Sequence, residues 1–145
     1  MILIDPNPIE ILRNKIETYL RENNYCYEVR SDGDFWIREE LSVVIIHPFQ
    51  YNEKSLVKIA SPVSLDINTI PPKLANILLK KNADEVFGRY VLISKEKVIW
   101  FEHILLGDNL NSGELITAVD IISNTASEND EWISDMTGGK TVIET

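Results

Sequence analysis

Hydrophobic positions along the chain recur at helical spacing in three segments. The first begins after Asn7, whose side chain can cap a helix, and continues with Pro8 at the first helical position and Glu10 in the first turn. Apolar residues then fall on one face of this segment, at Ile9, Leu12, Ile16 and Tyr19. Asn23 and Asn24 end the pattern, so the sequence predicts a first helix between these two signals.

Two more helices are predicted in the second half of the chain. A proline pair opens a short helix over residues 73–81, which Asn82 ends. The strongest start signal comes later, where Asn111 can cap a helix and Glu114 follows three residues after it. The apolar residues beyond this signal lie near one line on a helical wheel. We expect this last helix to continue to about Met136, with a glycine pair ending it.

Short runs rich in β-branched and aromatic residues predict strands between the helices. In chain order the predicted strands are residues 25–30, 35–38, 41–47, 56–60, 86–93 and 98–105. Short turns join most of them, which favours antiparallel pairing. The sequence therefore predicts an α+β fold in the order helix, three or four strands, helix, two strands, helix. Its antiparallel sheet of five or six strands is flanked by three helices gathered on one face.

The net charge of −9 is concentrated at the C-terminal end of the chain. Residues 101–145 contain one basic residue, Lys140, and nine acidic residues. Because nucleic-acid and anionic-membrane binding depend on neutralising phosphates, neither is an expected partner. The single cysteine, Cys26, cannot form an internal disulfide, and no stretch approaches the roughly 20 apolar residues of a membrane span. Without a signal-peptide pattern either, we expect a cytoplasmic protein.

No residue pattern predicts catalysis, a metal site or a cofactor. His47 and His103 lie at or near strand ends without a nucleophile in a recognised motif, so we interpret both as structural or surface residues. A histidine switch is the alternative. We interpret Cys26 as a buried free cysteine that behaves as a small apolar side chain. A reactive thiol is the alternative. Residues 137–141 end like a phosphate loop, but Ser134 stands where that motif needs its first glycine.

An acidic face on the last helix is one candidate surface for protein binding. Its members lie opposite the apolar line of the helix and are Asp120, Glu128, Glu131 and Asp135. A solvated outer face is the simpler interpretation, and a docking strip for a basic segment of a partner is the other. Ile121 and Trp132 extend the apolar arc of the same helix to one side.

The predicted sheet is a second candidate, because it carries more apolar surface than its helices can cover. Residues 41–46 and 98–101 are apolar on both alternating faces, whereas strands with one solvated face normally alternate. A partner, in the first instance a second copy, would cover the remaining face. We expect Ile99 and Phe101 in this contact. In the alternative, Ile121 and Trp132 wrap the second face within one chain.

Several segments resemble the YbjN-domain family. They are Ser61-Pro62-Val63, residues 78–82 and 87–92, and the closing helix with Asp130, Trp132 and its Gly138-Gly139 end. The resemblance extends from about residue 25 to residue 139. It implies a fold like that of the type III secretion chaperones, which commonly dimerise and bind extended segments of partner proteins. The resemblance carries over no catalytic residue. Some YbjN-like proteins are labelled sensory-transduction regulators.

The function expected from the sequence is non-enzymatic, chaperone-like binding of a protein partner by a homodimer. Residues 1–139 would form one YbjN-like domain, and residues 140–145 a flexible tail. Two alternatives stay open. One is a regulatory adaptor in signal transduction that recognises a folded partner. The other is an enzyme of unfamiliar type that uses His47 or His103 with carboxylates brought together by the fold.

Overall fold

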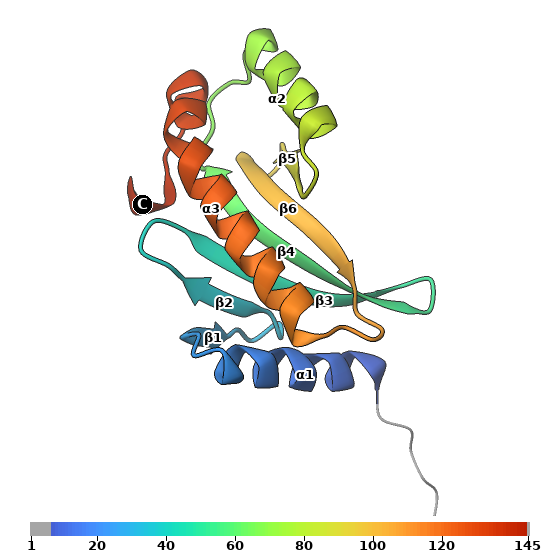
Figure 1. Ribbon diagram of the computed structural model, residues 1–145. Helices are drawn as coiled ribbons and strands as arrows, with labels where there is room; N and C mark the ends of the chain where they lie inside the picture. The colour runs from blue at the N-terminus through green and yellow to red at the C-terminus, as the bar shows by residue number, and fades with distance from the viewer. Residues whose placement is uncertain (1–6, 145) are drawn as a thin grey trace, which may run out of the picture.

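The computed structural model describes residues 7–144 and arranges them as one six-stranded sheet with three α-helices (Figure 1). The strands are β1 (Tyr27–Val29), β2 (Phe35–Arg38), β3 (Val43–Tyr51), β4 (Lys54–Ser64), β5 (Arg89–Ile93) and β6 (Val98–Leu106). The helices are α1 (Pro8–Glu22), α2 (Pro72–Asp84), α3 (Ser112–Thr137) and a short 3-10 helix, η1 (Val142–Glu144). All strand pairs are antiparallel in the order β1-β2-β3-β4-β6-β5. The predicted α+β fold is confirmed.

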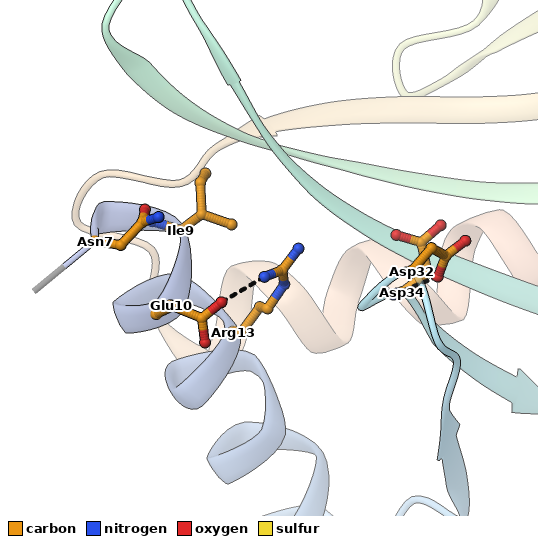
Figure 2. A network of polar contacts seen from close by, with 6 residues as sticks. All are labelled: Asn7, Ile9, Glu10, Arg13, Asp32 and Asp34. Carbon is orange, nitrogen blue, oxygen red and sulfur yellow. Dashed lines mark hydrogen bonds and ion pairs between the residues drawn. The ribbon is translucent and has the colours of Figure 1, made fainter.

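The N-terminal signals place α1 where the sequence predicts it. Asn7 Oδ1 accepts a hydrogen bond from the backbone N–H of Ile9 at 2.9 Å, and Arg13 pairs with Glu10 at 2.6 Å (Figure 2). The Arg13 guanidinium also lies against Gly33 in the β1–β2 turn, where a Cβ would come within 2.7 Å of it. The helix is therefore capped at its start and held close to the first hairpin.

The long helix α3 crosses one face of the sheet diagonally and packs on β3, β4 and β6 (Figure 1). Asn111 Oδ1 accepts the backbone N–H of Glu114 at 2.9 Å, as the start signal predicts. Its buried residues include Leu115, Val119, Ile122, Ala126 and Ile133. The helix runs to Thr137, one residue beyond the expected Met136, and Gly138 ends it with a left-handed φ of 74° as predicted.

Helix α2 stands at the end of the sheet opposite α1 and contacts β5 (Figure 1). It runs to Asp84, so Asn82 does not end it as expected. The Asn82 side chain instead accepts the backbone N–H of Tyr90 at 2.7 Å and donates to the Tyr90 carbonyl at 3.1 Å. This pair of bonds attaches α2 to β5.

Alternation along the strands separates a buried sheet face from an outer one. The buried face, against α1 and α3, carries Phe35, Ile37, Val44, Ile46, Val57, Ile59, Ile99 and Phe101. The register places Phe35 opposite Ile46, and Ile37 opposite Val44, so these side chains share one face. All eight are at most 2% exposed, and five of them are fully buried: Val44, Ile46, Val57, Ile59 and Phe101.

The β3–β4 hairpin is longer than predicted. Pro48 suggests a break, yet β3 continues through it to Tyr51, and β4 begins at Lys54. Only Val43–Ile46 of β3 pair with β2, so the later part of β3 has one unpaired edge, where a proline is tolerated. Asn52 and Glu53 close the turn with positive φ values of 46° and 66°.

The C-terminal residues differ from the expected flexible tail. Lys140 and Leu65 exchange two backbone hydrogen bonds of 2.8 and 2.7 Å, and Thr141 is 1% exposed. The Thr141 hydroxyl, just before η1, donates to Glu144 Oε1 at 2.9 Å. Residues 140–144 are therefore part of the packed structure, because Lys140 bridges to Leu65 beyond the end of β4 and η1 contacts β4; residue 145 of the expected tail lies outside the described residues.

Candidate functional site

The sheet face directed away from α1 and α3, here called the open sheet face, is a partly exposed apolar surface. Its side chains alternate with those of the buried face. From β2, β3, β4 and β6 they are Trp36, Ile45, His47, Phe49, Leu56, Lys58, Ala60, Trp100, Glu102 and Ile104. Ile104 is 38% exposed and lies in the part of β6 that extends beyond its pairing with β5. Such a surface is typical of a binding site, because soluble proteins rarely leave a large apolar patch uncovered.

A hollow of about 310 Å³ lies at the middle of the open sheet face. Its lining is Asp34, Ile45, His47, Lys58, Ala60, Ile93, Glu96, Trp100 and Glu102. Ala60 sits opposite Ile45 on one side and opposite Glu102 on the other, so three adjacent strands form the floor. The small Ala60 side chain leaves room between its larger neighbours.

Two acidic groups in this hollow have different surroundings. Asp34, in the β1–β2 turn region, lies 2.6 Å from His47 Nδ1 through one carboxylate oxygen, and the His47 ring stacks on Phe49 at 5.3 Å. The Glu102 side chain is 7% exposed and has Arg89 Nη2 at 3.6 Å from its Oε2. Within residues 7–144, no cluster of three or more histidine, cysteine, aspartate or glutamate side chains is arranged to hold a metal ion.

The second histidine belongs to the packing of the protein. His103 Nδ1 accepts the backbone N–H of Gly88 at 3.1 Å, and its ring stacks on Phe87 at 3.7 Å. Burial lowers the pKa of His103, which favours the neutral ring that this acceptor role requires.

Cys26 differs from expectation, because it is exposed on the surface.

Comparison with known proteins identifies the family of this fold. The family model described as "T3SS (YopN, CesT) and YbjN peptide-binding chaperone 1" matches residues 9–145. The chain belongs to this family. A search of curated proteins gave no match.

One solved structure similar to this family member is the crystal structure of the Yersinia pestis type III secretion chaperone SycH in complex with a stable fragment of YscM2. The two folds superpose with a TM-score of 0.60 at 17% sequence identity. The match covers 81% of this chain and 98% of that chain, so the fold predicted from the YbjN resemblance is confirmed. Between residues 7 and 144, each helix is too short or too polar to cross a membrane.

The strand residues expected in a partner contact, Ile99 and Phe101, lie on the buried face of this chaperone-family fold. They are 1% and 0% exposed, and Phe101 packs against Tyr90 at 4.8 Å. They are therefore core residues and contribute nothing to the outer surface. The intervening Trp100 is on the open sheet face, and the sequence had not singled it out.

The candidate residues on α3 lie on the helix side of the sheet. Asp120, Glu128, Glu131 and Asp135 are exposed, and Ile121 is half-buried. Trp132 packs against the core beside α2, with Lys81 at 5.7 Å from its ring and its Nε1 donating to Asn129 at 2.9 Å. Because α3 packs on the buried face, Ile121 and Trp132 do not cover the open sheet face.

Asp120 also has a partner within the chain. The Tyr25 hydroxyl donates to Asp120 Oδ1 at 2.6 Å. Burial, together with this hydrogen bond, raises the pKa of Tyr25. The bond links the loop before β1 to α3.

Proposed function

We propose that this protein is a non-enzymatic, chaperone-like module that holds an extended segment of a protein partner on its open sheet face. The family of peptide-binding chaperones supports the class of ligand. The observation that carries the proposal is the row of half-buried apolar and aromatic side chains on β3, β4 and β6, on the side away from α1 and α3. An extended peptide presents every second side chain to such a surface.

The proposed site gains affinity from apolar burial. Ile45, Trp100 and Ile104 are partly solvent-accessible in the protomer and would lose that exposure under a peptide. Full burial of a side chain of this size contributes about 1.5–3 kcal/mol. A few such contacts suffice for specific binding of a flexible segment, even after its ordering entropy is subtracted.

Binding of random-sequence peptides to the purified protein, measured by fluorescence anisotropy, tests this proposal. We expect saturable binding that Ile104→Asp weakens by about tenfold or more, because it places a charge in the apolar contact. Ile11→Asp is the matched control, because Ile11 is 45% exposed on α1 and away from the open sheet face. Absence of binding, or equal loss in both variants, would contradict the proposed site.

We also propose that the protein is a homodimer joined through the flank formed by α2 and β5. Apolar residues are unusually exposed here, with Leu79 at 69%, Val86 at 99% and Leu92 at 44%. Within the described sheet, β5 is an edge strand next to β6. Two copies that meet through this flank would cover both the apolar side chains and the edge by one two-fold contact.

Light scattering after size exclusion is expected to give twice the mass of one chain. Leu79→Glu should reduce this to the mass of one chain, because it places a charge in the two-fold contact. The matched Ile11→Glu variant should leave the dimer intact, since Ile11 lies on α1. Wild-type protein with the mass of one chain at its highest soluble concentration would refute the dimer.

We further propose a cytoplasmic location. The exposed thiol of Cys26 supports it, because a free surface thiol persists best in a reducing compartment.

A further inference from the structure

A buried carboxylate oxygen lines the hollow of the open sheet face without a hydrogen-bond donor. Among the described residues, Glu102 Oε2 has no hydrogen-bond partner, and the Glu102 side chain is 7% exposed. Arg89 Nη2 is 3.6 Å away, beyond the usual hydrogen-bond distance, and the Arg89 side chain is 60% exposed. Because a buried acceptor is costly when unpaired, this oxygen is suited to accept a donor from a ligand.

The aromatic wall of the same hollow is also uncovered. The chain has three tryptophans, and two of them each have a basic side chain of the same chain over the ring. Arg30 lies 4.0 Å from the centre of the Trp36 ring, and Lys81 lies 5.7 Å from that of Trp132. Among the described residues, Trp100 has no such cation, although its ring lines the hollow.

The charges around the hollow favour a cationic ligand. Three carboxylates line it, Asp34, Glu96 and Glu102, against one lysine, Lys58. Asp34 is already paired with His47 at 2.6 Å, whereas Glu102 has only a long ion pair with the exposed Arg89 at 3.6 Å, which leaves its Oε2 without a hydrogen-bond donor. Ile45 and Ala60 supply an apolar floor for the aliphatic part of a basic side chain.

We propose that this hollow binds an arginine side chain of the partner peptide, with the guanidinium against the Trp100 ring and donating to Glu102 Oε2. The inference rests on the proposed function, since the arginine belongs to the peptide held on the open sheet face. Arginine fits better than lysine because its planar group stacks on an aromatic ring while it donates to a carboxylate. The hollow thereby sets a preference for one basic residue within an otherwise apolar segment.

The test is an NMR titration with a blocked amino acid, N-acetyl-arginine methylamide, followed through the indole N–H signals. We expect the Trp100 signal to move, and the Trp36 and Trp132 signals to stay. The citrulline analogue, which has the same shape without the charge, should leave all three unchanged. Equal shifts with citrulline would overturn the proposal, as would arginine-induced shifts confined to α3.

Charge-neutral variants locate the contact. Glu102→Gln keeps the side-chain shape and should weaken arginine binding about tenfold, since a charge-assisted bond is replaced by a neutral one. Glu131→Gln on α3 is the matched control and should have no effect. If Glu102→Gln does not fold, Trp100→Leu, followed through the backbone amide of Ala60, should show the same loss. Full arginine affinity in a folded variant would refute the assignment.

Peptide pools separate this inference from the proposed function. Random peptides with one fixed arginine should bind about tenfold more tightly than pools with citrulline at that position. Equal binding of both pools would overturn the arginine site and leave the proposed function standing. Movement of the Trp100 signal by the blocked arginine, without binding of either pool, would support the hollow and overturn the peptide-binding proposal.

Discussion

Ile99→Asp is expected to unfold the protein, whereas Ile104→Asp on the same strand is expected to leave it folded. Both substitutions put the same charge in place of the same side chain, but Ile99 is 1% exposed and Ile104 is 38% exposed. Loss of a buried isoleucine together with burial of a carboxylate should cost about 4 kcal/mol or more, which approaches the whole stability of a domain at the low end of the usual range. For Ile104→Asp we expect a loss of about 1 kcal/mol or less.

Chemical denaturation followed by circular dichroism measures both free energies of unfolding. The pair also bears on the sequence-based expectation that Ile99 lies in a contact between copies, because a residue that is 1% exposed in the protomer cannot contribute to such a contact without unfolding. A folded Ile99→Asp variant, or an Ile104→Asp variant that is the less stable of the two, would mean that the two sheet faces are assigned the wrong way round.

Gly88→Ala is expected to destabilise the protein by about 2–4 kcal/mol, because two costs add at this position. Gly88 has a φ of +90°, which side-chain-bearing residues rarely adopt, and an added Cβ would lie 2.5 Å from Phe101 Cζ. Phe101 is fully buried and packs against Tyr90 at 4.8 Å, so its ring has little room to move. Thermal and denaturant unfolding of the variant measure the loss.

Gly113→Ala is the matched control for this prediction. Gly113 lies in the first turn of α3, and a Cβ there would meet only the Asn111 side chain at 3.5 Å, an ordinary contact. Since alanine is the better helix former, this variant should be as stable as the wild type or more stable by up to about 1 kcal/mol. Similar losses for the two alanine variants would refute a special role for Gly88.

The elements of the fold were predictable because their signals are local. Asn7 and Asn111 cap α1 and α3 as the sequence indicates, since a capping side chain needs only the next few residues. The hairpin of β5 and β6 follows from two apolar runs with a short turn between them. The helix–strand order then limits the topology to an antiparallel sheet with helices beside it.

The faces of the sheet were not predictable from the apolar pattern, because β6 is apolar on both sides. Ile99 and Trp100 are equally apolar in sequence, and only the packing of α3 decides which of them is buried. The sequence does contain one signal of the outer face. Glu102 is the one acidic residue of β6, and a charged residue inside a strand normally indicates the side that is not packed against the core.

Long-range contacts account for the other differences. The bridge between Lys140 and Leu65 joins residues far apart in the chain. The residues around Lys140 therefore carry no local signal of it, and their polar sequence predicts a flexible tail. Asn82 likewise looks like a helix stop in sequence, whereas its side chain binds the backbone of Tyr90 in β5. In both places a tertiary hydrogen bond overrides the local signal.

The most direct test of the central claim is an NMR map of the bound peptide on the isotope-labelled protein. The probe is the tightest-binding sequence selected from a random peptide library. We predict that its chemical-shift changes and cross-saturation concentrate on residues of the open sheet face, including Ile45, Ala60 and Ile104. Changes concentrated instead on the exposed acidic residues of α3, such as Glu128 and Glu131, would contradict the account.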